Sequence, residues 1–205
     1  MRFLSHSYSF HIHASTFSQL LFYYIILYNK NMEKAHIEKE YKILISQEDY
    51  ENILKYLPLE PKTQINYYYK VDNPKTTIRF RQIGKELYFT LKERVKDCHN
   101  EYEFKVRRRD FEDPKIQELL TKFNITEHVY LGSLTTSRAT LDMAYGQFCL
   151  DKSEYLGKTD YEIEYEFYDG EDVDDHEFND LLDLLHLTYT KQAKTKYARF
   201  LEALK

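Results

Sequence analysis

The sequence predicts an α+β protein that consists mostly of antiparallel strands, in a sheet that is either closed into a barrel or folded into a sandwich. From Ile37 onward, apolar and polar residues alternate strictly in many separate segments, which is the period of a half-buried strand. The connections between these segments are short, and helical stretches are fewer than strands. A βαβ arrangement is therefore not favoured.

The strand prediction covers most of the chain after residue 36. A weaker candidate near His128 to Leu131 accompanies eight clear segments. In chain order these are Ile37–Ile45, Ile65–Val71, Lys75–Ile83, Glu86–Val95, Asn100–Arg107, Thr135–Met143, Gln147–Asp151 and Asp160–Phe167. The abundance of aromatic residues, with 20 Tyr and 13 Phe, suits such strands because these side chains pack well on a pleated surface.

Helices are predicted where capping residues precede a stretch of helical period. The predicted helices run from Ser46 to about Leu57, with Asp49 completing a capping box; from Asp113-Pro114 to Phe123; from Asp174-Asp175 to about Leu187; and from Thr190 to the C-terminus. We expect these helices to pack against the apolar face of the sheet.

Composition favours a single globular domain in the cytoplasm. The chain has 205 residues, of which 42% are hydrophobic and 31% are charged, which suffices for one core. Its 34 acidic and 29 basic side chains nearly balance, which argues against a nucleic-acid partner. Cys98 and Cys149 lie far apart without further ligands at zinc spacing, so a reducing cytosol fits best.

The first 31 residues differ from the rest of the chain. Their apolar run, Phe17 to Tyr28, is too short to cross a bilayer and lacks the flanks of a signal peptide. Met32 then begins a segment that resembles the start of a soluble protein. We expect residues 1–31 to be translated non-coding sequence or a disordered extension, with a membrane anchor as the alternative, and residues 32–205 to form the single domain.

The polar face of each strong strand is charged. These faces carry Glu38, Glu40 and Lys42; Arg79 and Arg81; Thr90 and Lys92; Glu101, Glu103 and Lys105; Arg138, Thr140 and Asp142; and Glu162, Glu164 and Glu166. Each could be the solvated side of an antiparallel sheet. If the sheet closes with its apolar face outward, however, the charges line a wet interior suited to a polyanion bridged to carboxylates by divalent metal.

The order and spacing of the charged segments resemble those of the CYTH superfamily of triphosphate tunnel metalloenzymes, which includes class IV adenylate cyclase (CyaB) and thiamine triphosphatase, and within it a bacterial YjbK-like branch. The matching segments are Glu38-Lys39-Glu40-Tyr41-Lys42, Ile78-Arg79-Phe80-Arg81, Phe89-Thr90-Leu91-Lys92, Glu101-Tyr102-Glu103, Ser137-Arg138, Leu150-Asp151, Tyr161-Glu162-Ile163-Glu164 and Lys194-Thr195-Lys196-Tyr197. The resemblance covers Met32 to Lys205.

This resemblance implies an eight-stranded closed β-barrel, or tunnel, with helices packed outside it and Mg²⁺ or Mn²⁺ as cofactor. The implied metal ligands are Glu38, Glu40, Glu103, Glu162 and Glu164, with Glu101, Asp151 and Glu166 as possible replacements. The implied phosphate-binding residues are Lys42, Arg79, Arg81, Lys92, Arg138, and Lys194 or Lys196. The implied catalytic group consists of Glu38, Glu40, Lys42, Arg81, Lys92 and Arg138.

The expected activity is metal-dependent hydrolysis of a linear triphosphate, with inorganic tripolyphosphate first because no base-reading element is evident. Hydrolysis of thiamine triphosphate or of a nucleoside triphosphate and synthesis of cyclic AMP are the enzymatic alternatives, and a polyphosphate or nucleotide sensor is the non-enzymatic one. No phosphate-binding P-loop is present, and the chain has 5 Gly. We expect a small-molecule triphosphate as partner, no nucleic acid or membrane, and a monomer or homodimer.

Overall fold

The computed structural model describes residues 36–57, 59–96, 98–168, 176–188 and 191–205. The predicted extension, residues 1–31, lies outside these ranges, as do the expected capping residues Asp174 and Asp175 and the expected helix start at Thr190. No helix among the described residues is both long enough and apolar enough to cross a membrane.

The strands form one antiparallel sheet. They are β1 (His36–Glu38), β2 (Glu40–Ile45), β3 (Lys62–Val71), β4 (Thr76–Ile83), β5 (Glu86–Val95), β6 (Cys98–Val106), β7 (His128–Asp142), β8 (Gly146–Tyr155) and β9 (Lys158–Phe167). Their order in the sheet is β1-β6-β5-β4-β3-β7-β8-β9-β2, and every neighbouring pair is antiparallel. The predicted strands from residue 65 onward are thus confirmed, although the two candidates between His128 and Met143 are one strand, β7.

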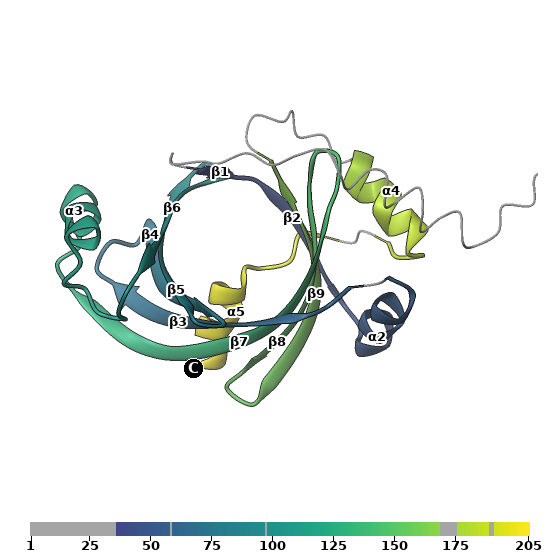
Figure 1. Cartoon of the computed structure of the whole chain (residues 1–205), viewed down its shortest axis with the longest axis horizontal. Helices are drawn as coiled ribbons and strands as arrows, with labels where there is room; N and C mark the ends of the chain where they lie inside the picture. Colours follow the sequence, from purple (N-terminus) through teal and green to yellow (C-terminus); the bar gives the residue numbers. More distant parts are fainter. Residues whose placement is uncertain (1–35, 58, 97, 169–175, 189–190) are drawn as a thin grey trace, which may run out of the picture. The chain divides into compact units, whose positions relative to one another are not determined.

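The predicted eight-stranded closed barrel is not confirmed, because this sheet has nine strands and two ends. The ends are β1 and β2, which are consecutive in the chain and separated only by Lys39. The backbone carbonyl of Lys39 accepts a hydrogen bond from the amide of Phe167, at 3.0 Å. The first predicted strand is therefore divided into β1, which pairs with β6, and β2, which pairs with β9. In Figure 1 the sheet curves around an opening.

The four helices in the described ranges are α2 (Gln47–Tyr56), α3 (Pro114–Lys122), α4 (His176–Leu184) and α5 (Lys196–Ala203). Ser46 and Asp49 form the predicted capping box, and Asp113 caps α3 before Pro114. The last helix begins later than predicted. Residues 191–195 are not helical; within them, the amide of Ala193 donates to the carbonyl of Lys42 in β2, at 2.9 Å.

Two apolar clusters cover the outer face of the sheet, and helices pack on each of them. Residues of α2 and α4, including Tyr50 and Phe178, pack with Ile43, Leu150 and Ile163 from β2, β8 and β9. On the other side, residues of α3 pack on the apolar face of β4, β5 and β6. Burial of each large apolar side chain contributes about 1.5–3 kcal/mol. The apolar face is thus directed outward under the helices, and the charged face is directed inward.

Helix α5 is the exception, because it packs on the inner face. Phe200 is fully buried against Tyr68, Leu134 and Tyr155, which lie on β3, β7 and β8. The ring of Phe200 is 5.2 Å from that of Tyr68, centroid to centroid. In Figure 1, α5 lies at the edge of the opening, where it overlaps β3 and β7. An apolar plug therefore occupies part of the interior.

We predict that Gly132→Ala destabilises the protein more than Gly84→Ala. Both glycines have positive φ, +141° and +57°, so alanine costs about 1 kcal/mol or more at either site. At position 132 the added Cβ would also lie 3.0 Å from the ring of Phe200, whereas position 84 is open. The additional overpacking should cost about 1–3 kcal/mol, measured by urea unfolding. Equal losses in the two variants would contradict this account of α5.

Candidate functional site

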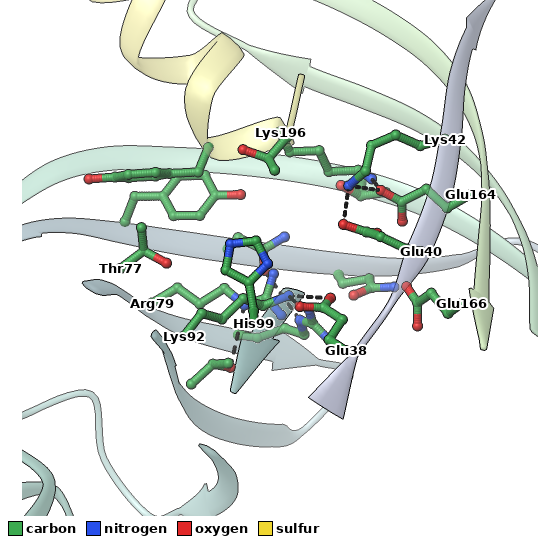
Figure 2. Close-up of a pocket in the computed structure, with 18 of the residues that line it drawn as sticks. Glu38, Glu40, Lys42, Thr77, Arg79, Lys92, His99, Glu164, Glu166 and Lys196 are labelled. Carbon is green, nitrogen blue, oxygen red and sulfur yellow. Dashed lines mark hydrogen bonds and ion pairs between the residues drawn. The ribbon is translucent and has the colours of Figure 1, made fainter. Parts of the chain in front are cut away.

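The inner face of the sheet forms a cavity in which charged side chains from seven elements meet. The charged residues that line it are Glu38, Glu40, Lys42, Arg79, Arg81, Lys92, Arg138, Glu164, Glu166 and Lys196. All were predicted as site residues, and Figure 2 shows most of them pointing toward one another from β1, β2, β4, β5, β9 and α5. These side chains therefore do not form the solvated outer face of the sheet, which was the alternative interpretation of the alternating pattern.

One side of the cavity is acidic and is organised by Lys196 of α5. Its ammonium lies 2.8 Å from Asp151 and 2.7 Å from Glu164, and it also pairs with Glu162. The three carboxylates are at most 4% exposed, and one oxygen from each lies within 4.8 Å of the others. Burial alone would raise the pKa of Glu164, but Lys196 and two further cations hold it well below its usual range.

A second group of carboxylates, Glu40, Glu164 and Glu166, shares Glu164 with the first and also has oxygens within 4.8 Å of one another. Glu40 forms an ion pair with Lys42. Burial is nevertheless the larger effect and, together with the charge of Glu164, raises the pKa of Glu40 to about 7. The Glu40 carboxylate therefore takes up a proton near neutral pH.

The guanidinium of Arg138 joins the two groups of carboxylates. Its Nη2 lies 2.7 Å from Asp151 and also contacts Glu164, and its Nη1 lies 2.9 Å from Glu166. Its Nε donates to Asp151 as well, at 2.9 Å. All three nitrogens of this side chain are thus engaged by carboxylates, which fixes the orientation of the acidic side.

The other side of the cavity is basic and consists of Arg79, Arg81 and Lys92 from β4 and β5. Arg79 lies 3.3 Å from Glu101 and 3.8 Å from Glu103, and Arg81 lies 3.7 Å from Glu103. These pairs are longer than those of Arg138, so much of the donor capacity of both guanidiniums remains available.

Two predicted metal ligands belong to this basic side. Glu38 forms an ion pair with Lys92, and Glu103 accepts a hydrogen bond from Thr90, at 2.6 Å. Neither residue belongs to a group of carboxylates that could hold an ion among the described residues. The same is true of Glu101, which lies 3.6 Å from Lys92. The predicted metal ligands therefore lie in two places. Five belong to the acidic groups, and Glu38, Glu101 and Glu103 lie beside bases and neutralise them.

The two acidic groups fit a hard divalent cation. They offer only carboxylate oxygens, which suit Mg²⁺ or Mn²⁺ better than a soft metal. The residues that could hold such an ion are Glu40, Asp151, Glu162, Glu164 and Glu166. Three of these were predicted as first choices and two as replacements.

The structure distinguishes between the two candidate lysines. Lys196 points into the cavity, whereas the side chain of Lys194 is 65% exposed and pairs with Glu202 outside it. The phosphate-binding prediction for Lys194 is therefore not supported by its position.

Sequence reasoning also missed Arg199, which is buried, pairs with Glu162 and lies 2.8 Å from Asp160. Its spacing of three residues from Lys196 on one helix was the available signal.

We predict that Glu40→Gln removes a pH-dependent loss of stability. The folded protein raises the pKa of Glu40 from 4.5 to about 7, so folding favours the protonated form. Its contribution to stability is complete below pH 4.5 and is lost as the pH rises through about 7. In EDTA, the thermal midpoint of the variant relative to the wild type should therefore increase from about pH 5 to about pH 8. A constant difference would contradict the assignment.

Comparisons with known proteins match most of the chain. A family model described as CYTH domain matches residues 36–201. The Bacillus subtilis (strain 168) protein named "Putative triphosphatase YjbK" is 30% identical, and the match covers 81% of this chain and 95% of the relative. None of the described residues of the cavity lies outside the matched range.

Solved structures show the same fold. A Bacillus halodurans protein described as a "putative adenylate cyclase" has a TM-score of 0.68 at 25% identity, over 82% of this chain and 97% of that chain. HpAC1 from Hippeastrum, described as a "putative adenylyl cyclase" with a dominant triphosphatase activity, has a TM-score of 0.61 at 18% identity, over 82% and 95% of the two chains.

Proposed function

Because this chain belongs to the CYTH family, we propose that it hydrolyses a linear triphosphate, inorganic tripolyphosphate first, with Mg²⁺ or Mn²⁺ as cofactor. The observation that carries the proposal is that one cavity brings together bases and carboxylates that could hold a metal. Arg79, Arg81 and Lys92 line it, as do Glu40, Glu164 and Glu166, and Asp151 and Glu162 form a second group with Glu164. The name of the Bacillus subtilis relative supports the same class of substrate.

The basic side would bind the phosphate chain. Phosphoryl transfer depends mainly on positioning and on neutralising the charge of the phosphoryl oxygens, for which guanidinium and ammonium groups suffice. Arg81 is the best placed of these residues, since its described contacts are a 3.3 Å hydrogen bond to Asn66 and the 3.7 Å pair with Glu103. Phosphate oxygens can replace such contacts at little cost.

The acidic side would hold the metal through Glu40, Glu164 and Glu166 or through Asp151, Glu162 and Glu164. When bound, a divalent ion of this kind polarises phosphoryl oxygens and lowers the pKa of a bound water. Without the ion, Lys196 and Arg138 neutralise these carboxylates. No Ser, Cys or His nucleophile is required by this chemistry.

A purely structural role does not explain these buried charges well. Replacing a buried ion pair with apolar residues is often neutral or stabilising, so such pairs are weak evidence for a gain in stability. Tripolyphosphate is favoured over a nucleotide because the tyrosine rings among the described lining residues, Tyr68 and Tyr197, pack edge to face, with centroids 5.1 Å apart. Neither tyrosine ring is thereby dedicated to a base.

The substrate prediction is tested with tripolyphosphate, thiamine triphosphate and ATP, each with Mg²⁺, with Mn²⁺ or with EDTA. We expect tripolyphosphate to be hydrolysed fastest, with no turnover in EDTA. Release of phosphate, pyrophosphate and cyclic AMP is measured separately. Faster turnover of another triphosphate would change the assigned substrate, cyclic AMP with pyrophosphate would indicate a cyclase, and binding without turnover would indicate a sensor.

The role of the basic side is tested by Arg81→Met, with Lys194→Met as the matched control. Loss of one positioned donor should lower kcat/KM for tripolyphosphate by about 100-fold or more. The thermal midpoint should be unchanged or higher, because Arg81 makes only long contacts in the described ranges. Lys194→Met should retain normal activity, since this side chain is exposed. Near-normal activity of Arg81→Met would show that phosphate does not bind here.

A further inference from the structure

Tyr68 has a hydroxyl that nothing in the described part of the chain satisfies. The residue is only 3% exposed and lines the cavity. Every fully buried polar side-chain atom in the described ranges has a hydrogen-bond partner, yet the Tyr68 hydroxyl has none there. The oxygen must therefore open into the cavity. A ligand that enters the cavity can therefore accept its hydrogen bond.

The direction of this hydroxyl is fixed by the packing of the ring. The ring contacts Tyr197 and Phe200 of α5, with centroids 5.1 Å and 5.2 Å away. Phe200 in turn lies over Gly132, which faces Tyr68 across the β3–β7 pair. A side chain held in this way loses little entropy when it binds a ligand.

The surroundings of the hydroxyl favour an anionic acceptor. Tyr68 faces Arg79 across the β3–β4 pair, and Arg79, Lys196 and Lys92 are the cations that act on it most strongly. Burial raises the pKa of Tyr68, so the group stays protonated and acts as a donor. A neutral donor beside three cations is suited to an oxygen of a highly charged anion.

We propose that the Tyr68 hydroxyl donates a hydrogen bond to a phosphate oxygen of the substrate at the α5 end of the cavity. This inference rests on the proposed function and assigns a substrate-binding role to a neutral residue. The phosphate that occupies this position would lie among Arg79, Lys92 and Lys196, so its charge would be neutralised there.

The test compares Tyr68→Phe with Tyr69→Phe. Tyr69 is the next residue of the same strand, is buried in the outer apolar cluster and does not line the cavity. For Tyr68→Phe we expect KM for tripolyphosphate with Mg²⁺, and Kd for tripolyphosphate in EDTA, to rise about 10-fold or more. The thermal midpoint without ligand should be unchanged or higher, because the ring packing is retained. Tyr69→Phe should match the wild type in KM and Kd.

Two results would overturn the proposal, and they are distinguishable. If the wild type binds or hydrolyses tripolyphosphate and Tyr68→Phe has the same KM and Kd, the hydroxyl does not contact the substrate and only this inference is wrong. If the wild type neither binds nor hydrolyses tripolyphosphate or another triphosphate, the proposed function is wrong and the role of Tyr68 is wrong with it.

Discussion

The ion pairs between Lys196 and the carboxylates of β8 and β9 are the interaction on which the inner face depends. Asp151, Glu162 and Glu164 are nearly inaccessible to solvent and have oxygens within 4.8 Å of one another. Their mutual repulsion and desolvation are compensated by cations that reach them from neighbouring elements. Removing one partner of such a buried pair costs about 3–5 kcal/mol. Because Lys196 belongs to α5, the charged cavity requires the C-terminal helix to be docked.

The C-terminal segment also covers backbone groups of β2 that the interruption of the first strand leaves at the end of the sheet. An end strand such as β2 presents unpaired backbone groups, which proteins usually cover. Here the amide of Ala193 donates to the carbonyl of Lys42, and the side chain of Gln192 bonds to the backbone of Glu40 and Lys42, at 3.0 Å in each case. The segment that supplies Lys196 therefore also covers the edge of β2, so the same residues support both the sheet and the cavity.

The strands and their charged faces could be predicted because period-two alternation is a local property of the sequence. The outward direction of the apolar face was one of two interpretations that this alternation left open. The interruption at Lys39 could not be predicted, because it depends on the pairing of β1 with β6 and of β2 with β9, which are distant in sequence. The partners of Glu103 could not be predicted either, because they depend on the register of β4, β5 and β6. Lys194 and Lys196 could not be separated either. They are identical in type and two residues apart, and only the extended path before α5 directs Lys196 inward. The substrate roles assigned to all these residues remain predictions.

The geometry also divides the arginines into two kinds, which the sequence pattern treats alike. Arg138 has short contacts from all three of its nitrogens to carboxylates, so a phosphate could bind it only by displacing one of these acids. Arg79 and Arg81 have contacts of 3.3 Å or longer, to Glu101, to Glu103 and to neutral groups. Exchange of a long contact for a charge-assisted one to phosphate is favourable. Arg138 is therefore better suited to orient the acidic groups, and Arg79 and Arg81 are better suited to receive the phosphate.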